Sequence, residues 1–200
     1  MSAIPKPLLT PEEYLVRERK AEFKSEYYRG EMFAMASASR EHNSVKDNLI
    51  IEIGTRLKGS PCRTFSSDQR VKVSPTGLYT YPDIVVVCGK AEYDSLDKDT
   101  LLNPVAIIEV LSPSTENYDR GAKFRQYEQL PSMKEYILVA QNEPVCERFV
   151  RQGDSDWLRT IVTGLAGELL FATLPVRIPM ADIYNGVEFP SEPTRGPVMT

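Results

Sequence analysis

The sequence predicts an α/β domain, in which helices flank a central mixed β-sheet and an antiparallel β extension follows. Three observations predict this class. Residues 84–88, 105–111 and 136–140 are continuous apolar runs, as expected for strands covered on both faces. A helical stretch at residues 120–130 separates the second and third runs, which predicts a parallel strand–helix–strand unit. After Val145 apolar and polar residues alternate, which is typical of antiparallel strands.

The N-terminal part of the chain is expected to contribute two helices and a hairpin. A Thr-x-x-Glu capping box at Thr10 predicts a first helix that ends near Lys20. Residues 25–36 carry apolar side chains on both sides of a central glycine, which predicts a β-hairpin. Apolar side chains recur at every fourth residue over 41–57, which predicts a second helix with one buried face.

Length and composition are those of one ordinary globular domain. The chain has 200 residues, of which 42% are hydrophobic and 26% are charged. We expect a single domain over residues 1–187 and a disordered tail over residues 188–200, which are rich in Pro, Ser and Thr. No apolar run is long enough to cross a bilayer and no secretion signal is visible, so the sequence predicts a cytoplasmic protein without a membrane partner.

The net charge limits the classes of nucleic-acid-binding protein to which the chain can belong. A formal net charge of −4 counts against a protein that coats nucleic acid through bulk charge. It does not exclude a metallonuclease, because metal-site carboxylates contribute to the negative total and a bound cation reverses the local field.

The three cysteines are Cys62, Cys88 and Cys146. Their number is odd and no two of them form a CxxC pair. Reduced thiols are therefore expected, in place of a disulfide framework or a zinc site.

Two carboxylates stand within or next to the apolar runs. Glu109 lies inside the run 105–111, where an ionised carboxylate is costly unless it is paired or binds a metal. It is therefore either a functional carboxylate or, as the alternative, a residue at the strand end that caps the following turn. Asp83 precedes the run 84–88 and is either a turn residue or, if the two strands are neighbours, a second carboxylate beside Glu109. Two carboxylates, a backbone carbonyl and waters form a suitable oxygen shell for Mg²⁺.

The predicted crossover helix carries a third group of polar residues. Asp119, Lys123 and Tyr127 follow one another at four-residue spacing and therefore share a helix face. A lysine aimed at the strand end would position a water or offset phosphate charge; the alternative is a solvated Asp119–Lys123 pair with Tyr127 in the core. His42 is the only histidine, which is more typical of a structural hydrogen-bonding residue than of a zinc ligand.

Taken together, these residues resemble a family of proposed restriction endonucleases that is abundant in cyanobacteria and belongs to the PD-(D/E)XK nuclease superfamily. The resemblance lies in Tyr81-Pro82-Asp83, in the run Ile108-Glu109-Val110-Leu111-Ser112-Pro113-Ser114-Thr115, and in Asp119, Lys123 and Tyr127. Glu26, Gly30-Glu31 and His42 resemble the hairpin and second helix of the family. The resemblance implies a restriction-endonuclease-like fold over nearly the whole domain.

The resemblance also implies an activity and its residues. The implied activity is Mg²⁺-dependent endonucleolytic hydrolysis of phosphodiester bonds, with DNA as the expected substrate and Mn²⁺ as a second candidate ion. The implied catalytic residues are Asp83, Glu109 and Lys123, with Asp83, Glu109 and the Val110 carbonyl as metal ligands. Glu26, His42, Asp119 and Tyr127 are the implied supporting residues.

One departure from the superfamily pattern concerns the lysine. The pattern places it two residues after Glu109, where this chain has Leu111, and the resemblance implies Lys123 as the spatial substitute. A non-catalytic nucleic-acid-binding or interaction module that retains the nuclease fold is the alternative function. The acidic net charge argues weakly for it, and the retained acid–acid–lysine set argues against it. The target, the preference for DNA over RNA, the biological role and a homodimeric state stay open.

Overall fold

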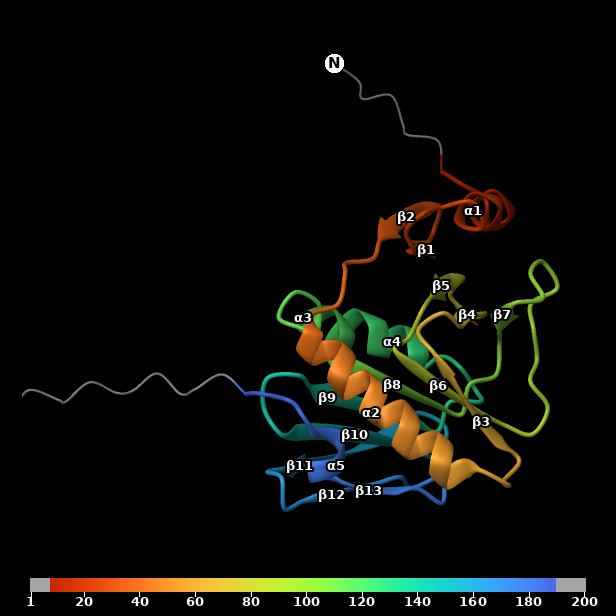
Figure 1. Cartoon of the computed structure of the whole chain (residues 1–200). Coiled ribbons are helices and arrows are strands. Elements are labelled where there is room, and N and C mark those ends of the chain that lie inside the picture. The colour runs from red at the N-terminus through yellow and green to blue at the C-terminus, as the bar shows by residue number, and fades with distance from the viewer. Residues whose placement is uncertain (1–7, 190–200) are drawn as a thin grey trace, which may run out of the picture.

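A computed structural model describes residues 8–189, and its largest element is a six-stranded sheet with the strand order β11-β10-β9-β8-β6-β3 (Figure 1). The strands are β3 (Cys62–Ser66), β6 (Ile84–Cys88), β8 (Ala106–Leu111), β9 (Glu135–Ala140), β10 (Val145–Gln152) and β11 (Asp156–Thr163). β8 and β9 pair in parallel and the other neighbours are antiparallel, so the sheet is mixed, as predicted. β10 and β11 form the predicted antiparallel extension.

A second, five-stranded sheet has the order β2-β1-β5-β4-β7. Its strands are β1 (Ser25–Tyr28), β2 (Glu31–Ala34), β4 (Arg70–Val73), β5 (Leu78–Thr80) and β7 (Thr100–Leu101). β12 (Glu168–Leu170) and β13 (Arg177–Pro179) form a separate antiparallel pair. Figure 1 shows the β1–β2 hairpin at one end of the molecule and the β12–β13 pair at the other.

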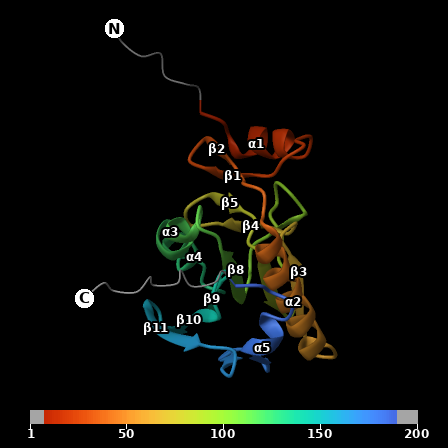
Figure 2. The same cartoon turned by 60° about the vertical axis from the view of Figure 1, so that its left-hand side comes forward.

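Helices cover both faces of the six-stranded sheet. They are α2 (Arg40–Leu57), α3 (Glu116–Tyr118), the π-helical segment η1 (Asp119–Lys123), α4 (Phe124–Tyr127) and α5 (Met180–Ile183), whereas α1 (Pro11–Glu18) packs on β1 and β5 of the five-stranded sheet. Figure 2 shows α2 on one side of β8 and β9, and the continuous α3–η1–α4 helix on the other. This crossover helix begins earlier than the predicted 120–130 and ends three residues sooner.

The two-sided cover explains the unbroken apolar strands. Along β8, Ile108 and Val110 belong to the core cluster that includes the apolar stripe of α2. Ile107 and Leu111 belong to the cluster on the other face, together with Tyr127. Because side chains alternate along a strand, Glu109 lies on the face of the crossover helix.

The N-terminal elements form as their local chemistry predicts. The Thr10 side chain accepts from the Glu13 N–H, and the Glu13 carboxylate accepts from the Thr10 N–H, which completes the capping box of α1. α1 ends at Glu18, slightly before the predicted Lys20. β1 and β2 form the predicted hairpin, and its turn needs Gly30, which has φ 89° and whose added Cβ would meet the Leu8 side chain at 2.6 Å.

The expectation of reduced thiols was wrong for one pair of cysteines. Cys62 and Cys88 are direct cross-strand partners of β3 and β6, with 3.9 Å between their Cα atoms, and they form a disulfide. Cys146 is free and buried. The two bonded cysteines are 26 residues apart and meet only because β3 pairs with β6, which their spacing in the sequence does not show.

The predicted disordered tail over residues 188–200 falls almost entirely outside the described residues. Over residues 8–189, no helix is both long and apolar enough to span a bilayer.

Candidate active site

Asp83 and Glu109 lie side by side at one end of β6 and β8. The antiparallel register pairs Ile84 with Ile108, so one further step places Asp83 opposite Glu109. The Asp83 N–H donates to Glu109 Oε2 at 3.1 Å, and the Val110 N–H donates to Asp83 Oδ2 at 2.9 Å. The structure therefore brings the two predicted carboxylates together.

Lys123 reaches this pair from the crossover helix. Its Nζ lies 2.9 Å from Glu109 Oε1, 3.3 Å from Asp119 Oδ1 and 3.6 Å from Glu26 Oε1. The Tyr127 hydroxyl donates to Glu109 Oε1 at 2.9 Å. All three side chains of the four-residue series face the site, so the alternative of a solvated Asp119–Lys123 pair does not hold.

The π-helical segment contributes to this alignment. In an α-helix each step of four residues turns the side chain about 40° past a full turn, so a series of three such residues drifts around the helix. Residues 119–123 form a π segment, whose wider turn offsets part of that drift before α4 begins. Asp119 and Lys123, at its two ends, are both buried.

Glu26 comes from the other sheet. It lies on β1 and accepts hydrogen bonds from the Thr80 hydroxyl and from the Tyr118 hydroxyl, the latter at 2.9 Å. Thr80 and Tyr118 were not predicted as site residues. Thr80 lies three residues before Asp83 and Tyr118 one residue before Asp119, but neither residue type nor spacing signals a contact with Glu26.

His42 approaches Asp83 from the start of α2. Ser39 caps this helix by accepting from the His42 N–H. His42 Nε2 lies 3.1 Å from Asp83 Oδ2, while its buried Nδ1 has no hydrogen-bond partner among the described residues. The histidine is thus placed to hold the orientation of the Asp83 carboxylate.

The charges in this cluster are unbalanced. The four carboxyl groups of Glu26, Asp83, Glu109 and Asp119 surround one ammonium, that of Lys123. Burial raises the pKa of Glu109 to about 8, although Lys123 opposes this shift. Burial also raises the pKa of Asp119.

The pKa values of Asp83 and Lys123 shift in the directions that keep both groups charged. Burial alone would raise the pKa of Asp83, but the hydrogen bond and charge of His42 and the Val110 N–H hold it below its ordinary value. Burial alone would lower the pKa of Lys123, but the surrounding acids, Glu109 first, raise it well above its ordinary value. Lys123 is therefore a permanent cation at neutral pH.

The donor set fits a hard divalent cation. Within the described part of the chain, no three or more His, Cys, Asp or Glu side chains form a metal cage. Mg²⁺ does not require one, because it keeps several waters and is commonly held by one or two carboxylates. Asp83 and Glu109 supply two adjacent carboxyl groups, and the acids of the cluster outnumber its one ammonium. The Asp83 side chain is 17% exposed, more than its acidic neighbours, so the site opens at Asp83.

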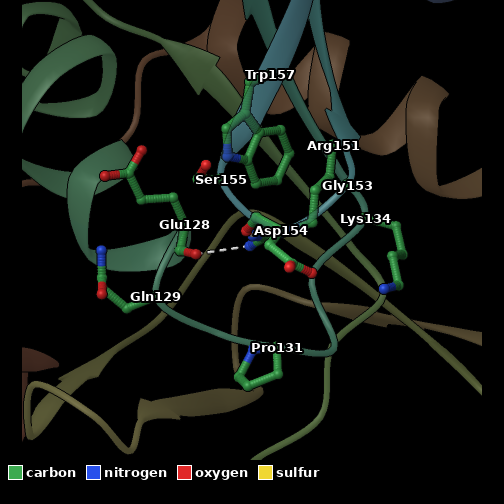
Figure 3. A pocket seen from close by; sticks show the side chains of 9 residues that line it. All are labelled: Glu128, Gln129, Pro131, Lys134, Arg151, Gly153, Asp154, Ser155 and Trp157. Carbon is green, nitrogen blue, oxygen red and sulfur yellow. Dashed lines mark hydrogen bonds between the residues drawn. The ribbon is translucent and has the colours of Figure 1, made fainter.

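A separate hollow of about 380 Å³ lies away from this cluster (Figure 3). Its lining includes Glu128, Lys134, Arg151 and Trp157. These residues precede β9 or belong to β10 and β11, at the opposite end of β9 from the strand end at which Glu109 lies. The Arg151 guanidinium donates to main-chain carbonyls, including that of Glu128. Arg151 therefore has a structural role, and this hollow contains none of the predicted site residues.

The mixed sheet, its helical cover and the acid–acid–lysine arrangement define the class as PD-(D/E)XK nuclease-like. A crystal structure described as "a putative nuclease belonging to DUF820", from Anabaena variabilis, matches with a TM-score of 0.69, over 86% of this chain and 96% of that chain. The two sequences are 15% identical, so this match shows the shared fold.

Residues 11–181 match the model of the Uma2 family, which is described as "Putative restriction endonuclease", and the chain belongs to this family. Two relatives come from Synechocystis sp., the uncharacterised proteins slr1290 and sll1609, and each is 34% identical to this chain. The alignments cover 92% and 84% of this chain, respectively, and 96% of each relative.

Proposed function

We propose that this protein is a metal-dependent endonuclease that hydrolyses phosphodiester bonds in DNA. The observation that supports the proposal most is the contact at 2.9 Å between Lys123 Nζ and the Glu109 carboxylate, which lies beside Asp83. An acid pair with a lysine at its edge is the set that the superfamily resemblance implies, and here a helix supplies the lysine that is missing at Leu111. The nuclease-like fold and the family description agree with this chemistry.

In this proposal Asp83 and Glu109 hold Mg²⁺ or Mn²⁺, together with the Val110 carbonyl. A bound divalent ion lowers the pKa of a coordinated water and stabilises charge on a phosphate. Lys123 orients the attacking water and offsets the phosphate charge. It does not act as a base, because the surrounding carboxylates raise its pKa and keep it protonated.

The supporting residues hold these groups in place. Asp119 and Glu26 fix the Lys123 ammonium through contacts at 3.3 and 3.6 Å. Tyr127 orients the Glu109 carboxylate by hydrogen bonding, and His42 contacts the Asp83 carboxylate. Each of these contacts keeps a reacting group in one geometry, which is the protein's main contribution to a metal-assisted hydrolysis.

Cleavage by the Glu109→Gln variant tests the proposal. This substitution keeps the shape of the side chain and removes the charge that binds the cation. Plasmid and single-stranded DNA are incubated with Mg²⁺ or Mn²⁺, and we expect cleavage by the wild type only when a metal is present and none by the variant. Glu168→Gln is the matched control, because Glu168 pairs with Arg177 on the β12–β13 pair, and this variant should cleave like the wild type.

Two results would contradict the proposal. Equal cleavage by the wild type and Glu109→Gln would assign the activity to another site or to a contaminant. Absence of cleavage by the wild type on both substrates with either metal would favour a binding module that retains the nuclease fold. Thermal melts of all three proteins show whether any loss of activity comes from unfolding.

A further inference from the structure

An exposed phenylalanine stands next to the acidic cluster on the edge strand β2. Phe33 is the direct cross-strand partner of Glu26, so the two side chains lie on the same face of the hairpin. The next pair, Tyr27 and Met32, points to the opposite face and packs with Tyr14 of α1. Phe33 is 48% exposed. Its ring therefore lies beside a site carboxylate and remains open to solvent.

A second aromatic ring contacts Glu26 from the crossover helix. The Tyr118 hydroxyl donates to Glu26 Oε2 at 2.9 Å, and the Tyr118 ring centroid lies 5.9 Å from Lys123 Nζ. Tyr118 is 39% exposed. Glu26 thus has two partly exposed aromatic neighbours, one from the β1–β2 hairpin and one from the crossover helix.

The chemistry of these rings favours nucleobases over phosphates as their ligands. A phenyl ring offers no charge and no hydrogen bond to a phosphate, but its face stacks on any base. In a duplex both faces of a base are covered by its neighbours, so only an unpaired or extruded base presents a free face.

The depth of the site agrees with an unpaired strand. Glu26, Glu109 and Lys123 are buried, and Asp83 is the most open of the charged groups. A phosphate must enter a recess to reach them, and a flexible single strand can bend into a recess more readily than a stiff duplex. The net charge of −4 leaves little general electrostatic attraction for a duplex, so short-range stacking contributes a larger share of the binding free energy.

We propose that Phe33 and Tyr118 form a stacking platform for an unpaired base beside the scissile phosphate, so that the substrate is single-stranded or locally unpaired nucleic acid. The inference rests on the proposed nuclease function and names its substrate class. It makes Phe33 a positioning residue that contacts the base, separate from the acidic groups that act on the phosphate.

The test is a binding measurement that does not depend on cleavage. Fluorescence anisotropy gives Kd for a fluorescein-labelled oligothymidylate and for a labelled duplex of the same length, in EDTA and again with Glu109→Gln protein in Mg²⁺. We expect the single strand to bind more tightly than the duplex. Phe33→Leu should weaken single-strand binding about tenfold, which corresponds to about 1.4 kcal/mol, whereas Phe33→Trp keeps the affinity.

A salt titration separates stacking from charge, and a control variant separates it from the general effect of replacing an exposed phenylalanine. Because a phenyl ring releases no counterions, Phe33→Leu should leave the slope of log Kd against log salt unchanged. Phe23→Leu is the matched control, because Phe23 is an exposed phenylalanine (77%) in the loop before β1 and is not a partner of Glu26. This variant should bind like the wild type.

Three results would overturn the platform. They are equal Kd values for the duplex and the single strand, an unchanged Kd in Phe33→Leu, and a shift from dimer to monomer in that variant, which would assign Phe33 to a contact between copies. Cleavage separates this proposal from the nuclease proposal. A wild type that binds single strands through Phe33 but cleaves nothing would refute the nuclease function alone, whereas equal cleavage of duplex and single strand would refute the platform alone.

Discussion

Replacing Glu109 with glutamine should abolish activity and raise stability. Burial raises the pKa of Glu109 from 4.5 to about 8 in the folded protein. The unfolded chain therefore releases this proton at lower pH than the folded one, and stability falls as the pH rises from 4.5 towards 8. Glutamine carries no charge, so the variant avoids this loss.

The size of the effect follows from the same shift. Between the unfolded pKa of 4.5 and pH 7 the wild type loses about 3 kcal/mol relative to a side chain that does not titrate. The gain of the glutamine variant is smaller than this loss, because its amide leaves one of the donors around Glu109 unpaired, at a cost of about 1–2 kcal/mol. The net expectation is a gain of about 2 kcal/mol, which raises Tm by about 4–8 °C in a chain of this size.

Urea unfolding between pH 4.5 and pH 8, in EDTA, measures this difference. The stability of the variant relative to the wild type should increase steadily with pH. Glu135→Gln is the control of opposite sign, because the buried Glu135 carboxylate accepts from two main-chain N–H groups and the Thr173 hydroxyl. It should lose about 1–3 kcal/mol. A Glu109→Gln variant that is less stable than the wild type at pH 8, or a difference independent of pH, would refute the reasoning.

Three further predictions concern other ionic and covalent links. Lys123→Met should lose cleavage and about 3 kcal/mol of stability in urea melts, because it leaves buried acids without their ammonium. Burial alone would raise the pKa of Asp97, but hydrogen bonds from Thr100 and Arg70 lower it to about 2. Asp97→Asn should therefore remove about 2 kcal/mol of stability at neutral pH, which the wild type loses only as the pH falls from 3.8 to 2; Asp99→Asn, at an exposed position in the same loop, is the control and should not change the urea midpoint at pH 7. Reduction of the Cys62–Cys88 disulfide should cost about 3 kcal/mol, and Cys62→Ser melts should not respond to dithiothreitol.

The local and short-range parts of the structure could be predicted from the sequence. The apolar runs at 84–88 and 105–111 predicted β6 and β8, and the helical stretch before 136–140 predicted the parallel pairing of β8 with β9. The spacing from Asp119 to Tyr127 predicted which helix face meets the strand. In each case the signal lies within one element or between two elements that follow one another in the chain.

The long-range parts could not be predicted in this way. Glu26 meets Lys123 because β1 lies beside β5 in one sheet while β8 lies in the other, and strand order leaves no mark on the local pattern. The Cys62–Cys88 disulfide was missed for the same reason. Only the family resemblance, which carries information about the whole fold, indicated Glu26 as a site residue before its position was known.

Lys123 connects the two sheets of the molecule. Its ammonium contacts Glu109 on β8 of the six-stranded sheet and Glu26 on β1 of the five-stranded sheet. Lys123 places one cation between these two acids, and the Tyr118 hydroxyl of the crossover helix adds a hydrogen bond to Glu26. The proposed hydrolysis and the packing of the hairpin on the rest of the domain therefore use the same ammonium group. Loss of Lys123 should therefore weaken the contact between the β1–β2 hairpin and the crossover helix, and also remove the cation that would face the phosphate.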